Sequence, residues 1–175
     1  MKSFGLMGKA VALTGVLVAL SGMPVFAGEA ELALLQEYVG DWRGTGAMTG
    51  ARNDTVTCRM SLSDATGTKL NYTGRCSFAG AQMAVRGTVA FNDAAGRYEA
   101  VMTANPGAYS GMAVGRRQGN GIVFDLKDRN IDQGNAYDIA SSMVLKDGKI
   151  GVSFKVTFAD SGESISANIP FDLKS

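Results

Sequence analysis

Apolar and polar residues alternate with a period of two from Gly40 to the end of the chain, in runs that short turn segments separate. Because side chains two positions apart share one face of a strand, each run predicts a strand with one apolar face. Residues 28–39 differ, since Leu32, Leu35 and Val39 recur at helical spacing and glutamates come early in the segment. The pattern therefore predicts one short helix followed by about ten strands.

Three hairpins have a register that keeps the large apolar residues on one face. In the first, that register also places Cys58 opposite Cys76. The second turns at Asp147-Gly148, a dipeptide that favours a two-residue type I′ turn. The third turns at residues 159–162 and shares a strand with the second. Both pairings bury the same face of that shared strand, so they support one another.

About ten consecutive strands joined mostly by short turns form an antiparallel meander. A sheet edge exposes unpaired backbone groups, and a long meander with one apolar face removes both edges by closing on itself. The sequence thus predicts an all-β fold, an antiparallel up-and-down β-barrel with a short N-terminal helix. A Greek-key sandwich is the alternative arrangement of the same strands.

The first 27 residues have the features of a cleaved bacterial export signal. Lys2 and Lys9 provide a positive start, residues 10–20 form an uncharged and mostly apolar run, and small residues precede a predicted cleavage after Ala27. An uncleaved membrane anchor is the alternative, but this run is shorter than the roughly 20 residues that a spanning helix needs. We therefore expect residues 28–175 to form one β-barrel domain in the periplasm or outside the cell, without stable membrane insertion.

Charge and composition exclude several classes of function. The formal net charge is +1, and removing Lys2 and Lys9 leaves 15 basic against 16 acidic residues, a charge of −1. This balance predicts no basic face for nucleic acid or anionic lipid. The chain has no histidine, which excludes Ser-His-Asp and Cys-His catalysis and histidine-based metal sites. We expect neither catalytic nor metal-binding residues, and the protein is predicted not to be an enzyme.

Charged side chains outside the apolar faces are interpreted as solvated. Asp125, Asp128 and Asp132 lie around the polar segment 127–134, whose spacing does not resemble a calcium loop, so a solvated loop is the preferred interpretation. Five arginines could recognise an anion, but their outward or loop positions make a solvated surface the default. These are Arg43, Arg59, Arg75, Arg116 and Arg117.

Cys58 and Cys76 are expected to form a disulfide, because they face each other in a protein that is predicted to be exported. A redox or metal-binding role is the alternative. Two cysteines without histidine make a poor metal site, so a structural cross-link is favoured. In the chain-entropy model, closing a loop of this size stabilises the fold by about 3 kcal/mol.

The segment Gly40-Asp41-Trp42, which begins the first strand after the helix, resembles the Gly-x-Trp signature of the calycins, the lipocalins and fatty-acid-binding proteins. The longer form GDWRGTG resembles the first strand of nitrobindin-type haem-binding barrels, which have ten strands. The resemblance implies that Trp42 packs as a plug across the closed end of the barrel. Arg43 beside it could stack on aromatic rings or close the barrel mouth.

Nitrobindin-type barrels hold their haem iron through a histidine near the C-terminal end, and this chain has no histidine. Tyrosine, methionine or cysteine can ligate haem in other proteins, but no residue of this sequence is marked for that role. We therefore expect no haem and no other cofactor.

The barrel interior is the remaining candidate site. Methionine adapts to irregular apolar partners, so several inward methionines among aromatic residues suit a loosely shaped lipophilic ligand. The inward parity of the strands predicts a lining of Met60, Tyr72, Met83, Tyr98, Met102, Met112, Tyr137, Met143 and Phe154. The same residues could instead fill the core, because small barrels are packed with side chains and wider ones keep a cavity.

We predict an exported calycin-like barrel that binds a small apolar or amphipathic ligand without acting on it chemically. One alternative is a structural envelope protein with a filled core. Another is a protein-interaction module such as a protease inhibitor. Some bacterial metalloprotease inhibitors are similar small disulfide-linked calycin barrels, and they act through a protruding N-terminal segment, which corresponds to residues 28–38 here.

Overall fold

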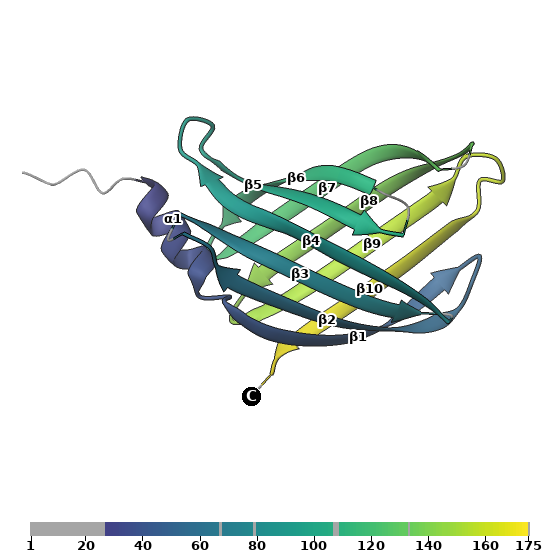
Figure 1. Cartoon of the computed structure of the whole chain (residues 1–175), viewed down its shortest axis with the longest axis horizontal. Helices are drawn as coiled ribbons and strands as arrows, with labels where there is room; N and C mark the ends of the chain where they lie inside the picture. Colours follow the sequence, from purple (N-terminus) through teal and green to yellow (C-terminus); the bar gives the residue numbers. More distant parts are fainter. Residues whose placement is uncertain (1–26, 67, 79, 107–108, 133, 175) are drawn as a thin grey trace, which may run out of the picture.

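Ten strands form a closed β-barrel, and a single helix lies across one of its ends (Figure 1). The computed structural model describes residues 27–174 apart from 67, 79, 107–108 and 133. Residues 1–26 of the predicted export signal therefore lie outside the described residues. Within the described part, no helix has the length and apolar character needed to cross a membrane.

The helix α1 spans Ala27–Gln36 and precedes all the strands. The strands are β1 (Gly40–Gly50), β2 (Asp54–Asp64), β3 (Lys69–Phe78), β4 (Ala81–Asn92), β5 (Arg97–Asn105), β6 (Tyr109–Gln118), β7 (Gly121–Asp132), β8 (Asn135–Lys146), β9 (Lys149–Phe158) and β10 (Ser164–Leu173). Each strand pairs antiparallel with the next, and β1 pairs antiparallel with β10, which closes the sheet. The predicted all-β up-and-down barrel with a short N-terminal helix is confirmed.

The registers predicted for the three hairpins are confirmed. Cys58 faces Cys76 between β2 and β3. The β8–β9 turn has positive φ at both Asp147, 52°, and Gly148, 67°, as a type I′ turn requires. Strand β9 presents the same face to β8 and to β10, which fixes the inner side of this part of the wall.

The predicted loop at residues 127–134 is wrong, because strand β7 continues through most of this segment. Its residues pair with β8, as Asp128 does with Ile139 and Asn130 with Tyr137. Polar side chains are tolerated here because the strand reaches the open end of the barrel, opposite α1, where its inner face meets water. Asp128 and Asn130 therefore lie on strand β7 at the barrel mouth.

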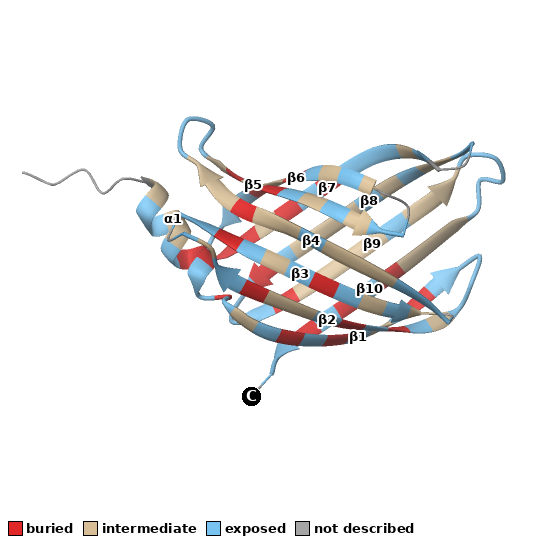
Figure 2. Cartoon of the chain, viewed as in Figure 1, coloured by how far each residue is buried: buried red, intermediate tan, exposed pale blue. Residues whose placement is uncertain are grey.

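The best-packed core lies at the end that α1 covers. We call residues 27–38, which form α1 and the turn after it, the helix plug. Leu34, Leu35 and Tyr38 of this plug are buried in the same cluster as the adjoining strand ends (Figure 2). The inward residues buried there include Leu62, Leu70, Val89, Tyr98, Ile122, Leu145 and Ile150. The helix thus completes a core that the strands alone would leave open to water.

The predicted disulfide joins Cys58 and Cys76 and is confirmed. The two Cα atoms lie 4.1 Å apart on β2 and β3, and the bond is on the inner face of the wall. Cys58 is 1% exposed. The cross-link is therefore part of the packed interior and fixes the register of these two strands.

Reduction of this disulfide should lower the free energy of unfolding by about 3 kcal/mol, because the cross-link restricts the unfolded chain. Urea unfolding followed by circular dichroism, with and without reductant, measures the difference. The double variant Cys58→Ala/Cys76→Ala is the control, since reductant should leave its midpoint unchanged. Equal midpoints for the oxidised and reduced wild-type protein would contradict the structural role of the bond.

Candidate ligand-binding site

Trp42 lies at the closed end of the barrel, directly behind the helix plug. Its side chain is 2% exposed, and its indole Nε1 donates a hydrogen bond to the Tyr38 carbonyl oxygen at 3.0 Å. The two rings stack with their centroids 6.3 Å apart. A buried indole N–H needs an acceptor, and the turn after α1 supplies it. Trp42 therefore links the first strand to the segment that closes this end.

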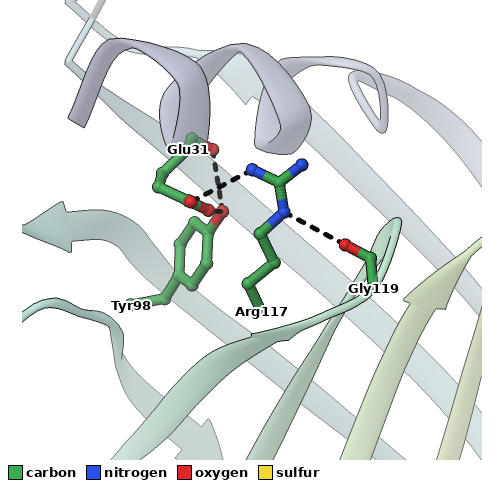
Figure 3. A network of polar contacts seen from close by, with 4 residues as sticks. All are labelled: Glu31, Tyr98, Arg117 and Gly119. Atoms are coloured by element: carbon green, nitrogen blue, oxygen red, sulfur yellow. Dashed lines mark hydrogen bonds and ion pairs between the residues drawn. The ribbon is translucent and has the colours of Figure 1, made fainter. Parts of the chain in front are cut away.

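A polar network fixes α1 to the barrel wall (Figure 3). The Tyr98 hydroxyl on β5 lies within hydrogen-bonding distance of the Glu31 carbonyl oxygen, at 3.0 Å, and of the Glu31 carboxylate. Arg117 on β6 pairs with the same carboxylate at 3.1 Å and donates through Nε to the Gly119 carbonyl oxygen at 3.1 Å. Burial, followed by the hydrogen bond to Glu31, raises the pKa of Tyr98. Tyr98 is therefore neutral and anchors the helix plug.

Arg43 does not belong to the plug, which corrects the prediction. Neighbouring residues along a strand face opposite sides of the wall, and Trp42 takes the inner position. Arg43 is exposed on the outer face, where it pairs in register with Arg59 of β2. An arginine on the outer wall cannot stack on the buried rings.

Burial of the inward side chains decreases from the closed end toward the open end (Figure 2). At the closed end Leu70 and Ile122 are 0% exposed, so the inward side chains there are completely covered. The inward side chains further along are covered less completely than those behind the helix plug. Met48, Val56 and Ala167 are exceptions, because they remain buried along β1, β2 and β10.

Eight of the nine residues predicted to line the interior occupy inward positions. Seven of them are partly buried: Met60, Tyr72, Met83, Met102, Tyr137, Met143 and Phe154. The eighth, Tyr98, is 0% exposed behind α1. The Tyr72 ring lies along the wall over Gly87, and its hydroxyl donates to the Val101 carbonyl oxygen at 3.2 Å. The Tyr72 side chain therefore crosses the inner face of β4 and reaches β5.

Met112 is the exception, and its predicted inward position is wrong. Its side chain is 50% exposed on the outer face, beside Val101, which is also 50% exposed. The inner positions of β6 belong to small residues such as Ala113 and Gly115. They are small because neighbouring rings occupy the space, and a Cβ added to Gly115 would lie 2.5 Å from the Phe124 ring. The space left by neighbouring side chains, and not hydrophobicity, decides which residues of β6 face inward.

Two polar pairs line the open end. The Tyr109 hydroxyl donates to Asp128 Oδ2 at 3.0 Å, and Asn130 Nδ2 donates to the Tyr137 hydroxyl at 2.6 Å. Burial, followed by the hydrogen bond to Asp128, raises the pKa of Tyr109 to about 12. Tyr109, Asp128 and Asn130 were not predicted as site residues. Leu126, Asp128 and Asn130 occupy alternate positions of β7, and this alternation is the signal that locates Asp128 and Asn130 on the inner face. Within the described ranges, no group of three His, Cys, Asp or Glu residues is placed to hold a metal ion.

Two hollows lie on the outer wall. The larger, about 920 Å³, is bordered mainly by outward residues of β1 to β6, and we call it the arginine groove. Inward residues also border it, namely Trp42, Met60, Gly74, Val85, Ala104 and Tyr109. Its charged lining consists of Arg43, Arg59, Arg75, Arg86, Lys174 and Asp41. The smaller, about 340 Å³, lies over β7 to β10. The prediction of no basic face, made from the near-balanced net charge, is wrong for this part of the surface. The acidic residues that balance the total charge lie mostly elsewhere on the protein.

No protein-family model matches the chain, and no curated protein matches its sequence significantly. Among solved structures, the chain is similar to Rv2717c from M. tuberculosis, with 15% identity, a TM-score of 0.61, and coverage of 82% of this chain and 97% of that one. It is also similar to the S-type phycobiliprotein lyase CPES from Guillardia theta, with 7% identity, a TM-score of 0.52, and coverage of 83% and 92%. At these identities the similarity establishes the shared barrel fold.

Replacing Trp42 by alanine should lower the free energy of unfolding by about 3–5 kcal/mol, because a buried ring is lost. Arg43→Ala, at the adjacent outward position, is the matched control and should change it by less than about 0.5 kcal/mol. Chemical denaturation followed by circular dichroism measures both variants. Similar losses for the two would show that Trp42 does not close this end.

Stability should fall at alkaline pH because of Tyr98. Its pKa is higher in the folded than in the unfolded protein, so the neutral phenol stabilises the fold fully below about pH 10 and less as the pH rises toward the folded-state value. Tyr98→Phe, which cannot ionise, should lose less free energy of unfolding between pH 8 and pH 11 than the wild type. The first pH lies about two units below the onset and the second about one unit above it. Urea titrations at the two pH values measure these losses, and equal losses would argue against this assignment.

Proposed function

We propose that the barrel binds one small apolar or amphipathic molecule inside its open half and does not act on it chemically. The observation that carries this proposal is the partial exposure of inward apolar side chains such as Met83, Met143 and Phe154. A filled barrel would bury them as completely as Leu70 and Ile122, which are 0% exposed. Barrel width grows with strand number, and ten strands exceed the eight whose interior side chains just fill.

The closed end determines how the ligand enters. The helix plug and Trp42 seal the side where the strand ends are packed, and Glu31 ties that plug to Tyr98 and Arg117. A ligand would therefore enter from the opposite end, past the polar pairs. An apolar body would lie among the methionine and aromatic side chains, which adapt to varied shapes.

The mouth favours a ligand with one polar end. Tyr109, Asp128, Asn130 and Tyr137 contribute hydroxyl, carboxylate and amide groups where the interior meets water. Each pair keeps free hydrogen-bonding capacity, since a hydroxyl can both donate and accept and an amide has two donors and an acceptor. An amphipathic molecule that leaves its polar group at this level would lose little hydration.

The proposal also states that the protein is exported and that it is a calycin-like barrel. The GDWRGTG segment and the barrel fold shared with Rv2717c support the calycin-like assignment. The Cys58–Cys76 disulfide supports an oxidising compartment, because cytosolic thiols are kept reduced. The absence of histidine from the sequence is the reason that the proposed ligand is not a histidine-ligated haem.

The protease-inhibitor alternative requires residues 28–38 to protrude from the barrel. These residues instead form most of the helix plug, and Leu34, Leu35 and Tyr38 are buried against the strands. No observation on the described residues favours inhibition over ligand binding, so ligand binding is the function we put to the test.

Titration with N-phenyl-1-naphthylamine, a neutral probe that fluoresces in apolar surroundings, tests the proposal. We expect saturable binding of one probe per chain. Ala104→Phe should weaken binding by about tenfold or more, because Ala104 faces inward on β5 and the added ring fills the open half. Thr103→Phe places the same ring on the neighbouring outward position and should leave binding unchanged.

Circular dichroism establishes that both variants are folded before binding is compared. Absence of saturable binding to the wild type, or equal binding by the two variants, would reject an interior site. Native mass spectrometry of the protein isolated from its natural host then identifies the molecule that it carries.

A further inference from the structure

A row of arginines crosses the outer wall along the arginine groove. Arg43, Arg59 and Arg75 face one another in register across β1, β2 and β3. Arg86 on β4 lies close by, paired with Thr73. Neighbouring strands are about 4.8 Å apart, so the first three side chains start within roughly 10 Å of one another. All four arginines are exposed.

None of these four guanidinium groups has a hydrogen-bond or ion-pair partner among the described residues. Arg97 and Arg117 elsewhere on the barrel do form ion pairs with glutamates. Asp172 faces Arg43 in register, but it pairs with Lys149 at 3.0 Å instead. Like charges directly opposite each other destabilise a sheet. The row therefore places like charges side by side without a neutralising partner among the described residues.

The groove combines this charge with hydrogen-bond donors and space. Five cationic side chains and the carboxylate of Asp41 line it, a net charge of +4, whereas the whole chain has a formal charge of +1. Ser61, Thr73 and Ser110 add hydroxyl groups along the same hollow. Its volume of about 920 Å³ lies within the range of small-molecule sites.

The cation type and spacing indicate phosphate groups as the ligand chemistry. Guanidinium groups bind phosphate through two parallel hydrogen bonds, which lysine cannot do. A terminal phosphate group carries nearly two negative charges at neutral pH, against one for a carboxylate, and each inner phosphate of a chain adds one more. A few linked phosphates therefore neutralise four crowded cations in the smallest volume. A hollow also fits a compact molecule better than the flat surface of a bilayer.

We propose that the arginine groove binds a soluble molecule that carries several linked phosphate groups. Arg59 is the central contact, because it has an arginine on each side. The four arginines lie on the opposite side of the wall from the predicted interior lining, so variants of them test this site separately from the proposed function.

Isothermal titration calorimetry with inorganic tripolyphosphate at physiological ionic strength tests the proposal. We expect one site per chain, and an affinity reduced about tenfold or more by Arg59→Gln, since a charge-assisted hydrogen bond is lost. Arg116→Gln is the matched control, because Arg116 is exposed on the outer face of β6 but outside the groove. It should change the affinity less than about twofold.

Thermal unfolding separates a binding role from a structural one. Arg59→Gln should melt at the same temperature as the wild type or higher, because it removes two like-charge contacts. If that variant fails to fold, the row is structural and the proposal is overturned. Arg75→Gln repeats the test at the end of the row and should also weaken tripolyphosphate binding.

Two further ligands define the chemical class. Citrate, a tricarboxylate, should bind more weakly than tripolyphosphate, and equal affinity would overturn the choice of phosphate. Phosphatidylglycerol vesicles should not co-sediment with the protein. Co-sedimentation without tripolyphosphate binding would assign the groove to a membrane and overturn a soluble ligand. Absence of tripolyphosphate binding, or equal loss in Arg59→Gln and Arg116→Gln, would also overturn the proposal.

Discussion

The pairing of β1 with β10 is the contact on which the rest of the structure depends. Once the first and last strands pair, no sheet edge remains, and every second side chain faces one enclosed space. The alternation of the sequence then has a fixed meaning, since its two parities become the inside and the outside of a closed wall. Trp42 and Arg43, which are neighbours in the chain, end on opposite sides for this reason.

Closure does not by itself determine how full the interior is. At one end the helix plug supplies Leu34, Leu35 and Tyr38, and the inward strand residues there are buried. At the other end no helix of the described chain enters, and the inner face ends in the pairs Tyr109–Asp128 and Asn130–Tyr137. The inward side chains are therefore buried more completely in the half that the plug closes than in the other half.

Much of the fold follows from local alternation because each hairpin register is decided by residues close in sequence. The Asp147-Gly148 turn and the apolar faces beside it are sufficient to align β8 with β9, and Cys58 with Cys76 aligns β2 with β3. The errors have non-local causes. Met112 faces outward because the Phe124 ring and the Cβ of Tyr98 occupy the inner space beside Gly115, and no pattern within β6 contains that information.

The positions of several polar groups also depend on residues that are distant in the sequence. Asp128 and Asn130 resemble loop residues in the sequence, but the length of β8 extends the pairing of β7 past them. The arginine row is also hidden, since Arg43, Arg59 and Arg75 are 16 residues apart from one to the next and meet only through the registers of two hairpins. A balanced total charge conceals such a row, because it says nothing about which charges share a face.

Methyl NMR of the methionines, with and without a neutral apolar ligand, tests the central claim most directly. The methyl signals of Met83, Met102 and Met143 should shift on addition of ligand, because these side chains are partly buried at inward positions, where the proposed ligand would lie. The signal of Met112, on the outer wall, should stay in place. Shifts confined to Met112, or no shift at saturating ligand, would contradict an open interior.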